Sequence, residues 1–443
     1  MALRWPVVLL VLLGLVPVAI WPSGGTVWWW LLLCAALVAV DVLLAPSPRQ
    51  LRLSRQAGES AHRQDDGTVL TQVRTGEPTS TTLLVRNPGR RTLTGELRDA
   101  WVPSAGAGRA RHTLRLPGGE RRRLTTTLLP TRRGDRHTDR VTVRSHGPLQ
   151  LAARQVTHRV PAVVRALPPF RSRQHLPSRL ARLRQLDGRS AVRTRGQGTE
   201  FDSLRDYVEG DDVRSIDWRA TARRQHVVVR TWQPERDRRV VLVLDSSRTS
   251  AARVGDEPRL DAAMDAALLL AALASRAGDK VDLIAGDRRL RGQVRPETNR
   301  TGLLNSLVTV MAPIQPVLVE ADWQLLAGTV NGTTRRKALV VLFTALDPAA
   351  IEQGLLPVLP ALTAHHQVVL ASVADPVLAE MTQDLSDLES VYGAAAAERT
   401  RSLRDRTAQA LGRLGVHVIE ASPEELPPRL ADHYLALKAR GLL

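Results

Sequence analysis

The chain has 443 residues, of which 43% are hydrophobic, and a formal net charge of +18 at pH 7. This length is enough for two or three domains of ordinary size, and so basic a surface attracts anionic lipid or nucleic acid. The single cysteine, Cys34, lies in an apolar run, which excludes a disulfide framework and a cysteine-based zinc site.

Two apolar runs open the chain, at residues 5–21 and 27–44, and a short uncharged turn separates them. The second run has about the length that a membrane-spanning helix needs. Arg4 precedes the pair and further arginines follow from Arg49. The positive-inside rule then places both termini in the cytoplasm. We predict two transmembrane helices within residues 1–46, in the plasma membrane, with a cleaved signal peptide as the alternative for the first run.

The second run contains one charged residue, Asp41. At 1.5 Å per residue it falls roughly 16 Å beyond the tryptophans that begin the run. Asp41 is therefore expected near the cytoplasmic end of this helix, where a carboxylate costs less free energy than at the bilayer centre.

Residues 47–167 have a different texture, with short runs rich in Val, Thr and Leu that Gly, Pro, Asn and Arg interrupt. Many of these runs alternate apolar and polar residues with a period of two. Evenly spaced strands of this kind predict a β-sandwich-like domain. The domain contains no catalytic cluster, so we interpret it as a structural or interaction module.

Residues 168–237 are less regular and are interpreted as a linker followed by a charged segment, with a short helix around residues 180–186. From residue 238 to residue 443 apolar strands alternate with helical stretches. Such alternation predicts a doubly wound α/β domain with a parallel sheet. The expected fold class is thus multidomain: a transmembrane helical hairpin, a β-sandwich-like domain and a C-terminal α/β domain.

The first strand of the α/β domain ends in Asp245, and Ser247 and Thr249 follow at alternate positions. Ligands of such sheets bind beyond the carboxyl ends of the strands. One carboxylate and two hydroxyls are hard oxygen ligands that suit Mg²⁺ or another divalent cation. We therefore expect a candidate metal site at this loop.

The charged segment from residue 198 to residue 223 combines many charged residues with aromatic residues that are otherwise scarce. This stretch and the strand that follows it resemble a bacterial family known as domain of unknown function 58. The resemblance rests on Gly196, Gly198, Glu200, Phe201, Leu204, Arg205, Tyr207, Gly210, Asp211, Arg214, Ile216, Asp217, Trp218, Ala222 and Arg223, followed by "LVLDSS". An upstream Arg-Arg-Gly segment is also similar, although Gly147 stands where the family usually has Asp.

The resemblance implies a von Willebrand factor A-like domain at the C-terminus and a frequent partner, a MoxR-type AAA+ ATPase. It also implies a metal-binding pattern in which a distant Thr and a later Asp join Asp245, Ser247 and Thr249. No such Thr precedes the helix at residue 321, and Thr344 and Ala345 stand where the Asp is expected, with Asp347 two residues later. The proposed metal ligands are Asp245, Ser247, Thr249 and Asp347, and a degenerate site is the alternative.

Three readings of the charged segment compete: a hydrolytic site, a nucleic-acid surface and a structural clasp. Interleaved arginines would neutralise the carboxylates of a hydrolase, no phosphate-binding loop occurs in the chain, and aromatic residues are too few to stack bases. We favour a clasp that packs on the α/β domain and shapes a partner surface, against a role in fold stability alone. Its members are Glu200, Arg205, Tyr207, Asp211, Arg214, Asp217, Trp218 and Arg223.

The sequence therefore predicts a non-enzymatic, membrane-anchored, cytoplasm-facing adaptor. It would bind the lipid bilayer and a protein partner, with a divalent cation such as Mg²⁺ as its cofactor, and act with a MoxR-type ATPase in the assembly or maturation of protein complexes. Nucleic acid is not an expected partner. The alternative is a metal-dependent enzyme with an unrecognised site.

Overall fold

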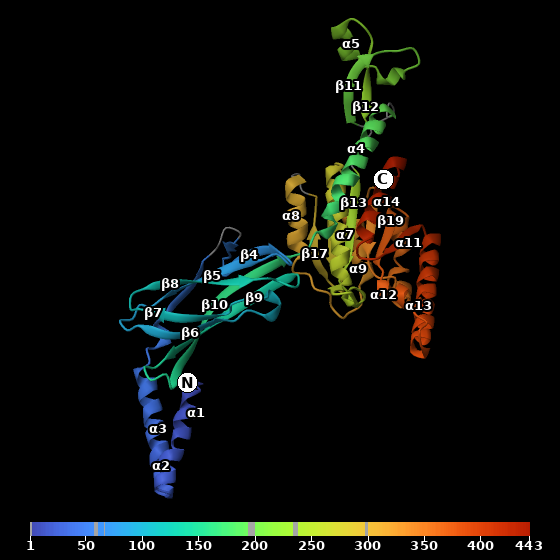
Figure 1. The fold of residues 1–443 in the computed structure, drawn as a ribbon. Helices are drawn as coiled ribbons and strands as arrows, with labels where there is room; N and C mark the ends of the chain where they lie inside the picture. Colours follow the sequence, from blue (N-terminus) through green and yellow to red (C-terminus); the bar gives the residue numbers. More distant parts are fainter. Residues whose placement is uncertain (1, 57–60, 66, 194–199, 234–237, 297–299) are drawn as a thin grey trace. The chain divides into compact units, whose positions relative to one another are not determined.

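The computed structural model describes residues 2–56, 61–65, 67–193, 200–233, 238–296 and 300–443 (Figure 1). They form two compact units, Met1–Pro169 and Phe170–Leu443. The first unit contains apolar helices and a β-rich body, and the second contains a parallel α/β body. The prediction of a multidomain chain with a sheet-rich region and an N-terminal apolar helix is confirmed.

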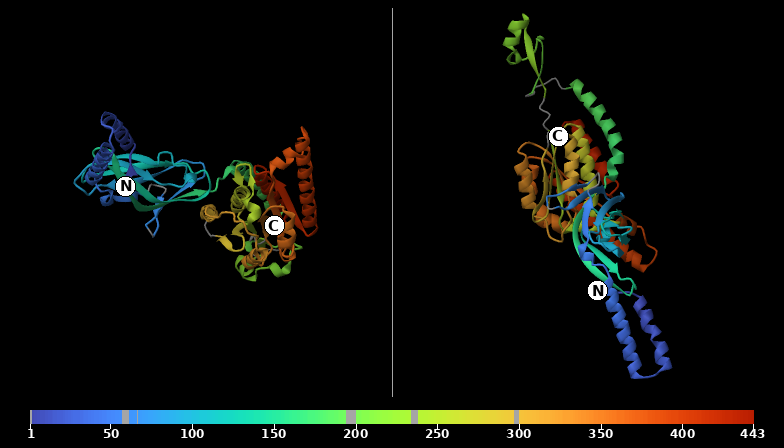
Figure 2. Two further views of the ribbon diagram at one scale, coloured as in Figure 1. Left: turned by 90° about the horizontal axis from the view of Figure 1, so that it is seen from below. Right: turned by 90° about the vertical axis from the view of Figure 1, so that its left-hand side faces the viewer.

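The apolar helices are α1 (Pro6–Leu13), α2 (Leu15–Ile20) and α3 (Gly24–Leu44). Among the described residues, only the span Gly24–Gln50 is long and apolar enough to cross a membrane, and α1 and α2 together are shorter. The helices lie side by side (Figure 2). Their close approach depends on Gly14, because a Cβ atom there would lie 2.3 Å from the Trp30 ring.

The strands of the first unit form two sheets that face each other. One has the order β3-β4-β10-β9-β6-β7, with β1 paired to β10, and the other has the order β2-β5-β8. The strands are β1 (Ala2–Leu3), β2 (Arg52–Gln56), β3 (Ala61–Arg63), β4 (Val69–Arg74), β5 (Thr79–Arg86), β6 (Leu93–Asp99), β7 (Arg111–Leu116), β8 (Arg121–Leu128), β9 (Gly134–His146) and β10 (Ala152–Leu167). Two short helical turns, η1 (Pro48–Gln50) and η2 (Pro103–Ala105), complete the unit.

The core of this unit follows from the period-two pattern of the sequence. Along β6, buried and exposed residues alternate without interruption. Leu93 and Leu97 point inward and meet Val141 of β9 and Leu83 of the opposite sheet. A buried ion pair, Arg55 to Asp99, joins the two sheets with a nitrogen–oxygen distance of 2.5 Å.

Asp41 connects α3 to the β-rich body. Its carboxylate accepts hydrogen bonds from the backbone N–H groups of Leu149, Leu151 and Ala152, at 2.7 to 2.9 Å, and the residue is 0% exposed. Gly147 makes room for it, because a Cβ atom at that position would lie 2.2 Å from Asp41 Oδ1. Gly147, which stands where the resemblance implies an Asp, thus has a steric reason in this chain.

Replacing Asp41 by Ala should leave three backbone N–H groups at the junction without their acceptor. We expect a loss of about 3 kcal/mol in the free energy of unfolding of the first unit, measured by thermal unfolding of the full chain in detergent. Asp139→Ala is the control, since that carboxylate is more than half exposed. Equal stability of the two variants would contradict this role of Asp41.

The second unit begins with η3 (Arg171–His175) and α4 (Leu176–Arg193), followed by a small hairpin. The hairpin consists of β11 (Glu200–Asp206), η4 (Val213–Ser215), α5 (Trp218–Arg224) and β12 (Val228–Gln233). The α/β body then comprises β13 (Arg239–Asp245), α6 (Arg248–Ala251), β14 (Arg253–Val254), β15 (Glu257–Pro258), α7 (Arg259–Arg276), β16 (Lys280–Gly286), β17 (Leu290–Val294), α8 (Arg300–Met311), α9 (Trp323–Thr333), β18 (Leu339–Phe343), α10 (Pro348–Ala350), η5 (Ile351–Leu355), α11 (Leu359–Thr363), β19 (Gln367–Val373), α12 (Pro376–Met381), α13 (Leu388–Arg413), β20 (Val416–Ala421) and α14 (Leu426–Arg440).

The sheet of this body has the strand order β17-β16-β13-β18-β19-β20 and is parallel except for the edge strand β17. Helices α7 and α14 cover one face, and α9, α11 and α13 cover the other. The strands are apolar on both faces for this reason, as in the fully buried run 240–244 of β13. The order reverses beside β13, where doubly wound sheets place their ligand sites.

A buried carboxyl group lies near the N-terminal ends of the parallel strands, away from the edge where ligands bind. Asp282 of β16 is 1% exposed, and its Oδ2 atom is 3.0 Å from Nε of Arg239. Burial raises the pKa of Asp282 to about 6, although the Arg239 guanidinium acts in the opposite direction. The folded protein therefore holds this proton at a pH where the unfolded chain has already released it.

The stability that the protonated Asp282 contributes should be present below pH 4 and lost as the pH rises through about 6. The shift corresponds to about 3 kcal/mol. Asp282→Asn should flatten this dependence, as measured by hydrogen exchange in β16 between pH 4 and 7, whereas Asp256→Asn in a fully exposed position should not. A wild-type profile in Asp282→Asn would contradict the assignment.

Candidate functional site

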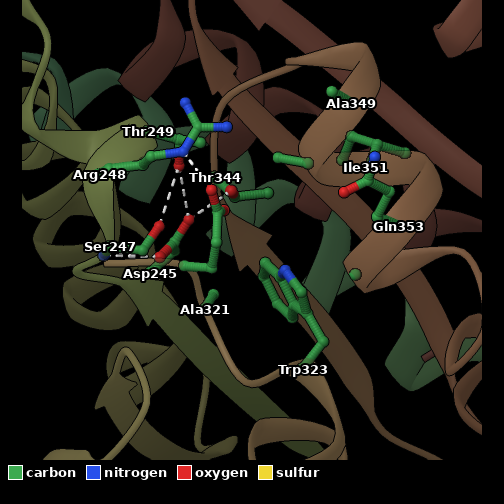
Figure 3. Close-up of a pocket in the computed structure, with 13 residues that line it drawn as sticks. Asp245, Ser247, Arg248, Thr249, Ala321, Trp323, Thr344, Ala349, Ile351 and Gln353 are labelled. Carbon is green, nitrogen blue, oxygen red and sulfur yellow. Dashed lines mark hydrogen bonds and ion pairs between the residues drawn. The ribbon is translucent and has the colours of Figure 1, made fainter. Parts of the chain in front are cut away.

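A cavity of 240 Å³ opens at the carboxyl edge of the parallel sheet, beside the ends of β13 and β18 (Figure 3). Asp245, Ser247, Thr249 and Thr344 are the buried polar residues of its lining. All four residues are less than 10% exposed. The site is therefore a recess in the protein rather than a flat surface.

Asp245 is at the centre of this group. Its Oδ1 atom accepts a hydrogen bond from the backbone N–H of Ser247 at 2.8 Å. Its Oδ2 atom accepts from the hydroxyls of Thr249 at 2.9 Å and Thr344 at 2.6 Å. The hydroxyls of Ser247 and Thr249 are 3.2 Å apart. These contacts compensate for much of the hydration that the buried carboxylate has lost.

The sheet register explains why Thr344 belongs to the site. Leu244 of β13 lies opposite Phe343 of β18, so the residues that follow them emerge next to each other. The sequence alone shows Thr344 only as a departure from the expected Asp. Strand adjacency, which is a tertiary property, is the signal that could have assigned it.

The fourth predicted ligand, Asp347, lies at the N-terminus of α10 and outside the cavity lining. Its carboxylate accepts a hydrogen bond from the backbone N–H of Ala350 at 3.1 Å and caps α10. It is not among the residues that line the cavity. The structure thus brings Asp245, Ser247 and Thr249 together and adds Thr344 in place of Asp347.

The rim of the cavity carries one residue of each charge. Arg248 forms an ion pair with Glu320 and remains partly exposed, as does Glu320. Trp323 lines the apolar side, where Gly354 allows the backbone to approach its ring. Among the described residues that line the cavity there is no histidine or cysteine, so no pair of a nucleophile and an imidazole base is present there.

The donor set determines which ligand could bind. A carboxylate and three hydroxyls offer only oxygen atoms, which suits a hard cation such as Mg²⁺. In the described part of the chain no three His, Cys, Asp or Glu side chains gather into a metal-binding group. The residues present therefore fit a divalent cation only if waters and a further carboxylate complete its coordination.

The predicted clasp residues lie in the small hairpin. Arg205 pairs with Asp211 at 2.5 Å, and this contact holds the pKa of the Asp211 carboxyl below its ordinary value. Asp217 caps α5 by accepting from the backbone N–H groups of Arg219 and Ala220, and it pairs with Arg230 at 2.8 Å. Carboxylates and guanidiniums thus pair as expected, and the hydrogen bonds and ion pairs of the described residues join members of the hairpin to one another.

The side chains of several clasp residues are more exposed than the prediction of a packed segment implies. The clasp prediction includes Trp218 and Tyr207 as residues that pack, but Trp218 is 66% exposed and Tyr207 is 37% exposed. Arg214 and Arg223 are also exposed. The side chain of Glu200 lies outside the described residues. Packing of the hairpin on the α/β body stays a prediction.

The different environments of Asp217 and Trp218 can be tested by mutation. Asp217→Ala removes the N-terminal cap of α5 and its link to β12, so amide hydrogens of α5 should exchange about fivefold faster. Trp218→Ala changes the adjacent residue but removes no buried contact, so exchange should stay close to wild type. Equal effects of the two substitutions would contradict the local clasp.

The fold and the site together define a class: a chain with an apolar N-terminal helix, a β-rich unit and a parallel α/β unit with an oxygen-lined cavity. The model of the family described as "Protein of unknown function DUF58" matches residues 203–413. The matched part includes most of the hairpin and the residues that line the cavity, and the match confirms the resemblance to this family.

Uncharacterized proteins of Mycobacterium bovis and Mycobacterium tuberculosis are 29% identical to this chain over 182 residues. The match covers 41% of this chain and 56% of theirs, so the chain spans about half the length of these curated relatives. A conserved hypothetical protein, BatB, from Bacteroides thetaiotaomicron has 16% identity and a TM-score of 0.30, over 45% of this chain and 98% of that one. An aerotolerance-related membrane protein from Bacteroides fragilis has 14% identity and a TM-score of 0.31, over 46% and 99%.

Proposed function

We propose that this protein is a membrane-anchored, cytoplasm-facing adaptor that binds a protein partner at the Asp245 cavity. A divalent cation such as Mg²⁺ would be held by Asp245, Ser247, Thr249 and Thr344 and completed by a carboxylate of the partner. The observation that carries this proposal is the buried carboxylate of Asp245, which lines an open cavity beside the hydroxyls of Ser247, Thr249 and Thr344.

The incomplete donor set supports a binding role. One carboxylate and three neutral hydroxyls bind a cation weakly, because Mg²⁺ demands an octahedron of oxygen atoms and dehydrates reluctantly. A carboxylate from a partner would add the missing charge at the mouth of the cavity. Metal and partner would then bind cooperatively, each raising the affinity for the other by the same factor.

Two features support the membrane anchorage. Helix α3 is apolar and long enough to span a bilayer, with Trp28 and Trp29 exposed near its start. Its cytoplasmic end would be the end that carries Asp41 and is followed by Arg49 and Arg52. Helices α1 and α2 would carry the chain outward across the membrane and α3 would bring it back, so that both termini face the cytoplasm. The first expected partner is a MoxR-type AAA+ ATPase, and the second unit would be a von Willebrand factor A-like domain.

Capture of a purified MoxR-type ATPase from the same organism by the full chain in detergent tests the proposal. Capture should require Mg²⁺ or Mn²⁺, fall at least about tenfold with EDTA, and recover when the cation is restored. Asp245→Ala should reduce capture as strongly, because it removes the only carboxylate among the four cation ligands. Asp256→Ala, at an exposed loop position, is the matched control.

Thermal unfolding must accompany these measurements, because Asp245 is buried and its loss releases two threonine hydroxyls. Thr344→Val keeps the side-chain volume, removes one oxygen and provides a milder second variant. Capture that survives both EDTA and the Asp245 substitution would overturn the metal-dependent site. Hydrolysis of phosphate or carboxylate esters by the chain alone, dependent on Mg²⁺, would favour an enzyme instead.

A further inference from the structure

A second cavity, of 510 Å³, lies within the first unit at the end of α3. Three segments line it: Leu44 and Pro46 after the helix, residues 91–94 before and in β6, and residues 146–150 of the turn between β9 and β10. Its polar groups are the guanidinium of Arg91, the hydroxyls of Thr92 and Thr94, the imidazole of His146 and the amide of Gln150.

The cavity opens at the C-terminal end of α3, beside Leu44 and Pro46. Leu43 and Leu44, at the end of α3, are 70% and 43% exposed, and the chain leaves the apolar span directly afterwards. Trp5, which precedes α1, is 68% exposed at the same end of the helical pair. Exposed leucines with a tryptophan beside charged groups are the pattern of a bilayer interface. If α3 spans the membrane, this cavity is at the depth of the lipid headgroups.

The charges around the cavity favour an anion. Arg91 donates one hydrogen bond to the Leu44 carbonyl, which uses one of the five N–H donors of a guanidinium. Arg4 donates a hydrogen bond to the side chain of Gln150, a residue of the cavity lining, at 2.9 Å and so lies next to the cavity. The nearby Asp41 carboxylate is already bonded to three backbone N–H groups.

The pKa of His146 reflects its burial and the charged residues around it. Burial lowers the pKa of His146, and Arg4 and Arg144 lower it further, while Glu96 and Asp41 act in the opposite direction. The imidazole is therefore neutral at pH 7 and can donate one N–H to a ligand. A phosphate group would offer acceptor oxygens to Arg91, to the two threonine hydroxyls and to this imidazole.

We propose that this cavity binds the phosphate of an anionic phospholipid headgroup at the cytoplasmic membrane surface. The shared chemistry is that of a phosphate anion, and the position beside exposed leucines selects a lipid as its source. The proposal rests on the membrane anchorage described under the proposed function. It adds a lipid-specific contact to the apolar one, and it is independent of the Asp245 cavity.

The test uses the full chain in a neutral detergent and native mass spectrometry, with two probes of equal acyl chains: dioleoylphosphatidylglycerol and dioleoylphosphatidylcholine. Phosphatidylglycerol should be retained, and Arg91→Ala should lower its retention about tenfold, since a charge-assisted contact is lost. Arg123→Ala removes an equal charge from an exposed position of β8 and should leave retention unchanged.

Three results would overturn the proposal. Equal retention of phosphatidylglycerol by Arg91→Ala and Arg123→Ala would show that the cavity does not bind the lipid. Retention of phosphatidylcholine equal to that of phosphatidylglycerol would show that binding does not need a net negative headgroup. Displacement of the lipid by millimolar inorganic phosphate would assign the site to a soluble phosphate. Flotation of the chain with pure phosphatidylcholine vesicles tests the anchorage separately, because the apolar helices alone should suffice for it.

Discussion

A carboxylate that is removed from water is stable only when hydrogen-bond donors replace its hydration, and this constraint organises the carboxyl edge of the α/β sheet. Asp245 takes its donors from the loop after β13 and from the end of β18, so that two segments about a hundred positions apart in sequence meet at one side chain. The groups bonded to this carboxylate are all neutral, so none of them balances its negative charge. Such a recess would suit the divalent cation of the proposed function.

The same constraint is met differently in the first unit. Asp41 is satisfied by backbone N–H groups of a turn, and that turn can approach the helix only because Gly147 lacks a side chain. Neither carboxylate relies on a salt bridge, whose gain would be offset by the cost of burying a second charge. Arg55 and Asp99 show the other solution, in which two buried charges face each other across the two sheets.

The sequence predicted the features that depend on local pattern. Strand and helix alternation after residue 238 was enough to identify the parallel sheet, and the apolar run before Asp245 was enough to place that residue at its carboxyl edge. Thr344 could not be assigned in the same way, because its role depends on which strand lies next to β13. Asp347 has the right chemistry and nearly the right position, but the backbone turns at the start of α10 and uses its carboxylate as a cap.

The hairpin shows where such reasoning failed. The clasp hypothesis predicts that Trp218 packs against the α/β domain, yet this side chain is exposed. A segment of about thirty residues buries too small a fraction of its surface to enclose an indole ring. Charge pairing was predicted better than packing because Arg205 and Asp211, like Asp217 and Arg230, need only a turn or one strand pair to meet.

The strand β10 has a mechanical consequence. Ala152 and Ala153 at its start pair with the residues that precede α1, and the same end of the strand is bonded to Asp41 of α3. The segment before α1 and the end of α3 are thus both bonded to the start of β10. This strand runs for 16 residues, roughly 50 Å. It ends at Leu167, shortly before the second unit begins at Phe170. A strand that is hydrogen-bonded on both sides resists stretching along its axis. Tension applied to either helix would therefore be transmitted along β10. A pull on one helix would also load the strand end to which the other helix is attached.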